Sequence, residues 1–155
     1  MNEYLYSFDL SMSNTGIAIF NLDGIIENIC SVSTNEKETH GQRLKTIADF
    51  IIGLQEQYPA KIVVIERGFA RFNIATSVIY RVHGIVNFLF WDVRQIYYPP
   101  KTVKAEILNG KATKKEVREK IESFYPNIKF NNEDESDAVS VGLAYFIRNG
   151  TIKWR

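Results

Sequence analysis

The chain has 155 residues, of which 45% are hydrophobic and 24% charged, and its formal net charge is +1. This composition is typical of a folded globular domain and excludes a disordered chain, and no apolar run approaches the ~20 residues of a membrane-spanning helix. The only cysteine, Cys30, excludes an internal disulfide and a cysteine-based zinc site. We therefore expect one domain over residues 1–155, in a reducing, cytoplasmic environment and with no membrane partner.

Hydrophobic periodicity divides the chain into strands and amphipathic helices. The Asp23-Gly24 pair predicts a tight turn between two strands, and Thr113 with Glu116 forms the capping box of a helix start. Strands first in a meander and then alternating with helices predict an α/β domain with a mixed sheet. In chain order we expect strands at 4–10, 15–22 and 25–33, a helix ended by Pro59, a strand at 61–66, a helix at 73–92, a strand at 95–98, and helices at 101–108, 113–123 and about 136–148.

Carboxylates lie at the edges of three separate expected elements. Asp9 lies where the first strand meets a polar turn, Glu66 closes a buried strand, and Asp134 and Asp137 open the last helical segment. In open α/β sheets, functional side chains collect at the carboxyl ends of strands. Mg²⁺ takes hard oxygen ligands, so these converging acids predict a divalent-metal site. For any one acid the alternative is a surface or turn residue, and acids at a helix start also complement the helix dipole.

Charge is unevenly distributed in the second half of the chain. Residues 99–120 have a local balance of +4, and the acidic cluster at 133–137 follows. A basic stretch beside an acidic cluster would hold phosphates near a metal centre. The alternative is a solvated helical face whose charges neutralise one another in pairs.

Four segments, in order, resemble the motifs of the RuvC-type Holliday junction resolvases: 9–16, IVVIERGF at 62–69, NGKATKKEV at 109–117 and ESDAVSVGLAY at 135–145. The resemblance covers most of the chain and implies an RNase H-like fold with a mixed five-stranded sheet flanked by helices. The small size and divergent motifs are more similar to phage-encoded members, which act in the host cytoplasm. Leu10-Ser11 departs from the family's Pro-Gly, and residues 80–84 match its Gln-x-Arg-Gly only loosely.

The resemblance implies that Asp9, Glu66, Asp134 and Asp137 hold two Mg²⁺ ions, with Mn²⁺ as a substitute, on either side of a scissile phosphate. One ion would generate the attacking water and the other would stabilise the departing 3′ oxygen. Lys104 and Lys114 fall where the family has lysines that approach the phosphate, and the resemblance implies that they stabilise negative charge in the transition state. Ordinary exposed lysines are the alternative for both.

The resemblance also implies DNA contacts outside the carboxylates. An aromatic at the position of Phe69 contacts bases at the junction centre in the family, and Arg67 and Arg71 flank it. Core packing of Phe69 is the alternative. Lys104, Lys111, Lys114, Lys115 and Arg118 complete the expected set of DNA-binding residues.

Helix 73–92 has apolar residues on more than one face. The resemblance implies that this helix builds a homodimer interface, which suits the approximate two-fold symmetry of a four-way junction. A helix fully buried within one monomer is the alternative.

The sequence thus predicts a Mg²⁺-dependent endonuclease that resolves four-way DNA junctions by symmetric paired nicks, and that also cuts forks and other branched DNA in a looser variant. Two alternatives stay open. One is an RNase H-like nuclease on structured RNA, and the other is a non-catalytic module that binds branched nucleic acid.

Overall fold

The computed structural model of the chain describes residues 1–68 and 74–154 and contains a mixed five-stranded sheet. The strands lie in the order β3-β2-β1-β4-β5. β1, β2 and β3 form an antiparallel meander, whereas β4 pairs parallel with β1 and β5 pairs parallel with β4. The bounds are β1 Tyr4–Asp9, β2 Asn14–Asn21, β3 Ile26–Ser33, β4 Ala60–Glu66 and β5 Arg94–Tyr98. The expected mixed sheet of five strands is confirmed.

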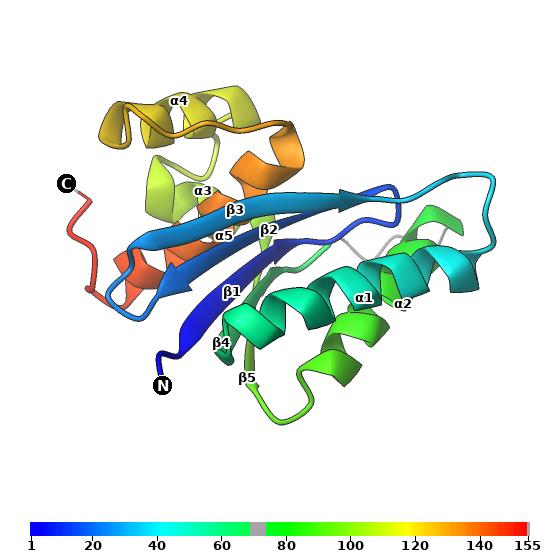
Figure 1. Cartoon of the computed structure of the whole chain (residues 1–155). Coiled ribbons are helices and arrows are strands. Elements are labelled where there is room, and N and C mark those ends of the chain that lie inside the picture. Colours follow the sequence, from blue (N-terminus) through cyan, green and yellow to red (C-terminus); the bar gives the residue numbers. More distant parts are fainter. Residues whose placement is uncertain (69–73, 155) are drawn as a thin grey trace.

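Helices cover both faces of this sheet (Figure 1). Helices α1 and α2 lie on one face, which we call the α2 face, and helices α3, α4 and α5 lie on the other, which we call the α5 face. The bounds are α1 His40–Gln57, α2 Ile74–Leu89, α3 Pro100–Ile107, α4 Lys114–Phe124 and α5 Glu133–Arg148. Within the described part of the chain, no helix is both long and apolar enough to cross a bilayer.

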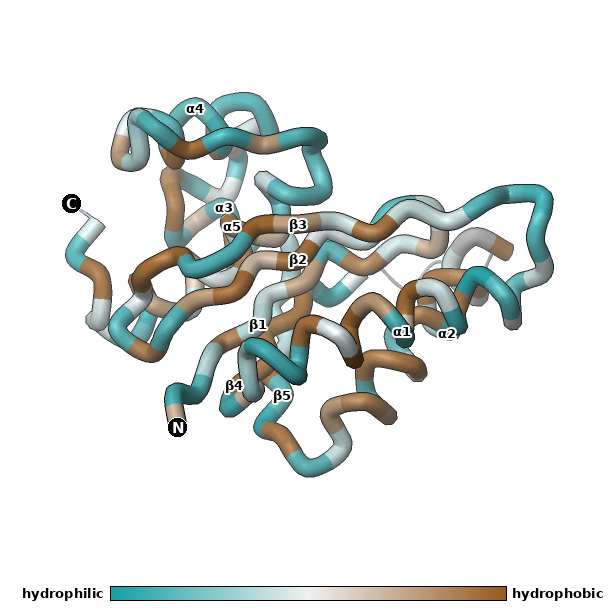
Figure 2. The backbone as a smooth tube through the Cα atoms, in the orientation of Figure 1, coloured by the Kyte–Doolittle hydropathy of each residue, from teal (hydrophilic) through white to brown (hydrophobic). Residues whose placement is uncertain are grey.

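Alternation along the central strands decides which side chains face which helices. On β1, Leu5 packs in the core under α5, while Tyr6 and Phe8 pack in the core under α1 and α2. On β4, Val64 packs toward α5 and Ile65 toward α2. In Figure 2 the central strands carry brown, apolar stretches between paler ones. Glu66 lies two residues beyond Val64, and Asp9 lies four residues beyond Leu5, so both acids project toward the α5 face.

Two expected helix boundaries are wrong. The last helix begins at Glu133 rather than near residue 136, because the side chain of Asn132 accepts a hydrogen bond from the Glu135 backbone N–H at 3.0 Å and caps an acidic first turn. Helix α2 ends at Leu89 rather than at 92, since the Val93 N–H turns back to the Phe90 carbonyl oxygen. The capping box at Thr113 is confirmed.

Candidate active site

The sheet brings the first two acids to neighbouring positions on its central parallel strands. Phe8 on β1 pairs with Ile65 on β4, so Asp9 and Glu66 are the next residues on each strand. Both strands end at this edge, and the first turn of α5 lies over the same end of β1 and β2. Asp9 pairs with Gly16 on β2.

Gly16 explains how closely α5 approaches this edge. A Cβ atom at residue 16 would lie 2.0 Å from the backbone oxygen of Asp134, far inside van der Waals contact. Only a glycine lets the first turn of α5 rest directly on β2, beside Asp9. The close approach brings Asp134 and Asp137 to the two strand-end acids, so the structure gathers all four sequence-predicted carboxylates at one edge.

Proximity and burial raise the pKa of three of these carboxyl groups. Desolvation, a hydrogen bond with Asp134 and the charges of its acidic neighbours raise the pKa of Asp9 to about 8. Burial and the charge of Asp137 raise the pKa of Glu66. Burial also raises the pKa of Asp137, although Lys114 opposes the shift. Such coupled, buried acids are held together at an electrostatic cost that a cation would relieve.

Two lysines lie beside the carboxylates. Lys104 and Lys114 line a pocket of about 280 Å³ together with Glu66 and Asp137. The Nζ of Lys114 donates to Oδ2 of Asp137 at 2.5 Å. Burial alone lowers the pKa of Lys114, but the bond to Asp137 and the nearby acids raise it overall, so the lysine is a cation at neutral pH. These two predicted lysines are thus placed beside the carboxylates.

A hydrogen-bonded chain from the neighbouring strands orients Asp134. The Nδ2 of Asn14 on β2 donates to Oδ2 of Asp134 at 2.7 Å, and the Ser33 hydroxyl on β3 donates to Oδ1 of Asn14 at 2.7 Å. Partners of this kind fix the direction of metal-ligating side chains. The role of Asn14 was not predicted from the sequence, although this residue lies within the motif at 9–16. The only sequence feature that pointed to it was its amide side chain among the polar residues that follow Asp9.

Glu135 is a second residue that sequence analysis left without a role. Its side chain is 2% exposed and accepts hydrogen bonds from the Ser31 hydroxyl at 3.0 Å and from the Asn131 backbone N–H at 2.8 Å. These contacts tie the start of α5 to β3 and to the preceding segment. Glu135 therefore positions the first turn of α5, whereas Asp134 and Asp137, on either side of it in sequence, belong to the carboxylate site.

The donor set fits a hard divalent cation, although its side chains currently bond elsewhere. Within residues 1–68 and 74–154, no group of three or more His, Cys, Asp or Glu side chains is already arranged to hold a metal ion. Asp137 bonds to Lys114, and Asp9 shares a hydrogen bond with Asp134. Exchange of these two contacts would leave a set of carboxylate oxygens, the kind of ligand that Mg²⁺ prefers. Asp9, Glu66, Asp134 and Asp137 are the residues that could hold it.

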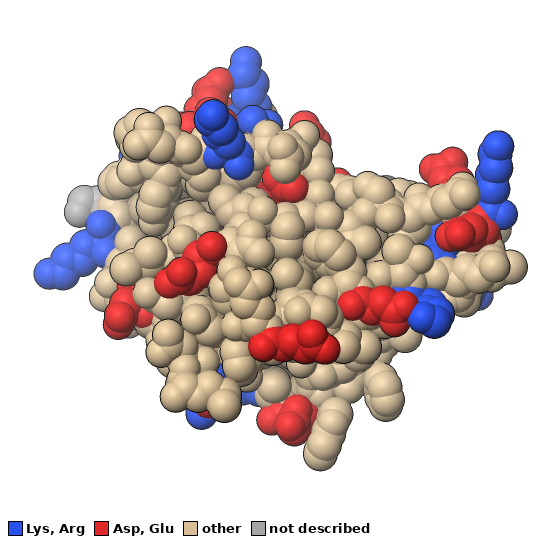
Figure 3. Space-filling view, viewed as in Figure 1, with Lys and Arg blue, Asp and Glu red and all other residues tan. Residues whose placement is uncertain are grey.

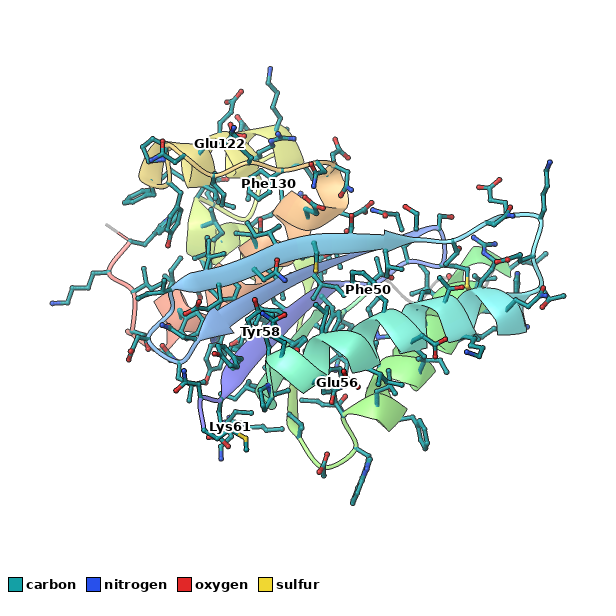
Figure 4. All side chains as sticks on the ribbon, in the orientation of Figure 1. Phe50, Glu56, Tyr58, Lys61, Glu122 and Phe130 are labelled. Atoms are coloured by element: carbon teal, nitrogen blue, oxygen red, sulfur yellow. The ribbon has the colours of Figure 1, made fainter. Side chains whose placement is uncertain are left out.

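The other predicted DNA-binding residues either do not contribute to the described lining of the carboxylate pocket or lie outside the described residues. On α4, Lys115 lies 3.8 Å from Glu119, while Arg118 bonds to Glu122 at 2.9 Å and stacks over Phe130 at 5.3 Å. Figure 4 shows Glu122 at α4 and Phe130 close to this helix. Figure 3 shows basic side chains over α4 beside acidic ones. These contacts match the alternative of paired charges on a solvated helix.

The loop after β4 is described only in part. Arg67 lies just beyond Glu66, with its guanidinium 6.0 Å from the centre of the Tyr97 ring. Phe69 and Arg71 lie outside the described residues. Lys111 is exposed at the turn between α3 and α4, and its backbone N–H bonds to Asn109.

Comparison with known proteins finds similar sequences among crossover junction endodeoxyribonucleases. The chain is 28% identical, over 88% of its length and 92% of the relative's, to the crossover junction endodeoxyribonuclease RuvC of Ehrlichia canis. It is 26% identical, over 78% of its length and 71% of the relative's, to the protein of the same name from a Synechocystis species. No family model matches the chain.

Solved structures share the fold over nearly the whole chain. RuvC of Thermus thermophilus superposes with a TM-score of 0.81 at 20% identity, covering 97% of this chain and 98% of that one. The same protein in complex with a Holliday junction substrate superposes with a TM-score of 0.82 at 17% identity and the same coverage. The yeast mitochondrial Holliday junction resolvase gives a TM-score of 0.57 at 16% identity, covering 97% of this chain and 82% of that one. The RNase H-like fold is confirmed, and the relatives' names support the RuvC family of Holliday junction resolvases.

Proposed function

We propose that this protein is a Mg²⁺-dependent endonuclease that resolves four-way DNA junctions by symmetric paired nicks. One observation carries the proposal: four carboxylates from β1, β4 and α5 gather at one edge of a sheet whose fold is shared with a resolvase solved on a Holliday junction. The names of the curated relatives support a nuclease that acts on DNA crossovers. Forks and other branched DNA are further substrates under this proposal.

The catalytic roles follow from the chemistry of the site. Asp9, Glu66, Asp134 and Asp137 would hold two ions, with Mn²⁺ able to replace Mg²⁺; when bound, such ions supply an activated water and positive charge at the departing oxygen. Asn14 keeps the Asp134 carboxylate turned toward the site. Lys114, released from Asp137, turns its ammonium toward the scissile phosphate, where it offsets the charge that develops in the transition state.

A homodimer would place two such sites on one junction. The outer side of α2 and the turn that follows it expose large side chains, with exposed fractions of 73% for Phe88 on the helix and 78% for Trp91 in the turn. Large exposed aromatic side chains close together in sequence are typical of a surface that a partner covers. A second copy related by a two-fold axis would match the symmetry of a four-way junction, so that two opposed strands are nicked.

We further propose that the chain is a single nuclease domain encoded by a phage and active in the host cytoplasm. The sheet with its two cores spans the described chain. The identities of 26–28% to bacterial relatives and the lack of a matching family model support a divergent branch.

The test uses purified protein with a labelled four-way junction, a fork, a linear duplex and a structured RNA, each with Mg²⁺ or with EDTA. We expect symmetric nicks in the junction that require Mg²⁺ and are absent in Asp9→Asn. Cleavage of the RNA with none of the junction would overturn the proposal in favour of an RNA nuclease. Tight junction binding without cleavage would favour a non-catalytic binding module.

A further inference from the structure

A second and larger pocket opens on the α2 face. Its volume is about 590 Å³, and its lining includes Arg67, Tyr80, His83, Asn87, Tyr97 and Pro100. It lies between helix α2 and the ends of β4 and β5, and none of the four catalytic carboxylates contributes to its described lining. The proposed chemistry therefore leaves this pocket without a role.

Aromatic rings form one wall of the pocket. The His83 ring lies 6.0 Å from Tyr80 and 6.5 Å from Tyr97, and it is within 24° of parallel to the Tyr97 ring. The Tyr97 hydroxyl donates to Oε1 of Gln95 at 3.2 Å and accepts from Asn87, which fixes the ring on β5. Burial lowers the pKa of His83, so its ring is uncharged at neutral pH. Flat, largely uncharged rings are the surfaces on which nucleobases stack.

The charge of the pocket suits a nucleotide. Arg67 lines the pocket and holds its guanidinium 6.0 Å from the centre of the Tyr97 ring. Among the described lining residues, Arg67 is the one that carries a full charge, and none is acidic. A cation next to stacked rings combines a phosphate contact with a base platform, as single-stranded nucleic acid requires.

The pocket adjoins the carboxylate site across the edge of the sheet. Pro100 lines both the 590 Å³ pocket and the 280 Å³ pocket of the carboxylates. Glu66 lines the carboxylate pocket, and the next residue, Arg67, lines the 590 Å³ pocket. The backbone stays extended between them, because the Arg67 N–H continues the β4–β5 pairing by donating to the Tyr98 carbonyl oxygen at 2.7 Å. A strand whose phosphate sits at the carboxylates therefore has its adjoining nucleotide within reach of the α2 face.

We infer that the pocket of Arg67, Tyr80, His83 and Tyr97 binds one unstacked nucleobase of the cut strand, next to the scissile phosphate. The inference rests on the proposed function and deepens it, since it names the part of the substrate that this face recognises. Bases at the centre of a branched junction are more easily unstacked than those within a duplex, so such a pocket favours branched over linear DNA.

The experiment measures junction affinity by fluorescence anisotropy in EDTA, which prevents cleavage. One junction is intact, and two others carry an abasic site at one or the other nucleotide that flanks the scissile phosphate. For wild-type protein we expect one abasic site to weaken binding roughly 10-fold. His83→Ala should bind the intact junction roughly 10-fold more weakly and lose little more at the abasic site, because the base and the ring act as one contact. The control is His40→Ala, at the chain's other histidine on α1, which should keep the full abasic effect.

The outcomes separate this inference from the proposed function. Equal abasic losses in wild type and His83→Ala, with tight junction binding in both, would overturn the base pocket and leave the nuclease intact. No selective binding of the junction by wild-type protein would contradict the proposed function itself. A change in dimer dissociation in His83→Ala, without any change in the abasic effect, would assign the pocket to a second copy of the chain and overturn the inference. Tyr80→Ala repeats the test on a ring exposed at the pocket, should His83→Ala fail to fold.

Discussion

The two faces of the sheet meet at one edge but differ in which kinds of side chain they bury and which they expose. On the α5 face, the carboxylate site contains partly buried charged and amide groups, several of which are held by hydrogen bonds, as in the chain from Ser33 through Asn14 to Asp134. On the α2 face, large apolar rings such as Phe88 and Trp91 are left exposed. Buried, fixed charges suit chemistry, because they need no reorganisation during the reaction. Exposed rings suit association, because covering them releases water.

If this contrast is correct, loss of one carboxylate should have the largest effect. Asp9→Asn removes an ionisable oxygen donor but preserves shape, so junction cleavage should fall roughly 10³-fold or more, in line with the several kcal/mol that a metal contributes to the transition state. Junction affinity in EDTA should change little. The measurement is single-turnover cleavage, with circular dichroism as the folding control. Loss of binding together with the fold would show a structural role instead.

A charge placed on the α2 face should break association and leave the carboxylate site unchanged. Trp91→Lys should weaken the homodimer by about 2–4 kcal/mol, the range of a central aromatic contact. Analytical ultracentrifugation over a dilution series measures the dissociation constant, and Leu22→Lys on the β2–β3 turn serves as the matched exposed control. An unchanged dissociation constant would show that the dimer interface does not include the turn after α2.

Removal of an orienting group on the α5 face should have a smaller effect than removal of an acid. Asn14→Ala frees the Asp134 carboxylate from its 2.7 Å bond, and losses of this kind reduce metal affinity or activity about 10- to 100-fold. Titration of Mn²⁺ by calorimetry measures the affinity. Asn28→Ala, nearer the start of β3, is the control. Equal metal affinities for wild type and Asn14→Ala would show that Asp134 needs no orientation by Asn14.

The smallest expected effect concerns stability. The pKa of Asp9 rises from 3.8 to about 8 on folding, so the folded protein binds its proton more tightly than the unfolded chain. The stabilising contribution is complete below pH 3.8 and is lost as pH rises toward 8. Asp9→Asn should therefore stabilise the metal-free protein by about 1–2 kcal/mol at pH 8 and by less at pH 5. Urea denaturation at both pH values measures the difference, and equal gains at both would contradict it.

Regular patterns made most of the fold predictable from sequence. Alternation placed the five strands to within two residues, and the capping box at Thr113 marked the start of α4. The start of α5 at Glu133 was not predicted, because its first turn is polar and its cap, Asn132, lies in a run of polar residues without an apolar face. A helix start that is fixed by a side-chain cap and followed by a polar first turn shows no hydrophobic periodicity, so a search for such periodicity does not find it.

The carboxylates of the site could be predicted from the sequence, whereas the residues that orient them could not. Asp9 and Glu66 lie at strand ends, where the geometry of a parallel pair brings them together. The roles of Asn14 and Glu135 depend on contacts between residues over 100 positions apart, which no local pattern encodes. The aromatic pocket depends likewise on α2 packing beside β5 and was not anticipated.

The metal site is tested most sharply with a crystal of the protein soaked in Mn²⁺ and measured at a wavelength where manganese scatters anomalously. We expect manganese among Asp9, Glu66, Asp134 and Asp137, with the Lys114 ammonium released from Asp137, and no such signal in Asp9→Asn crystals. Manganese bound only elsewhere, with Lys114 still bonded to Asp137, would contradict the claim that this edge of the sheet is a metal-dependent catalytic centre.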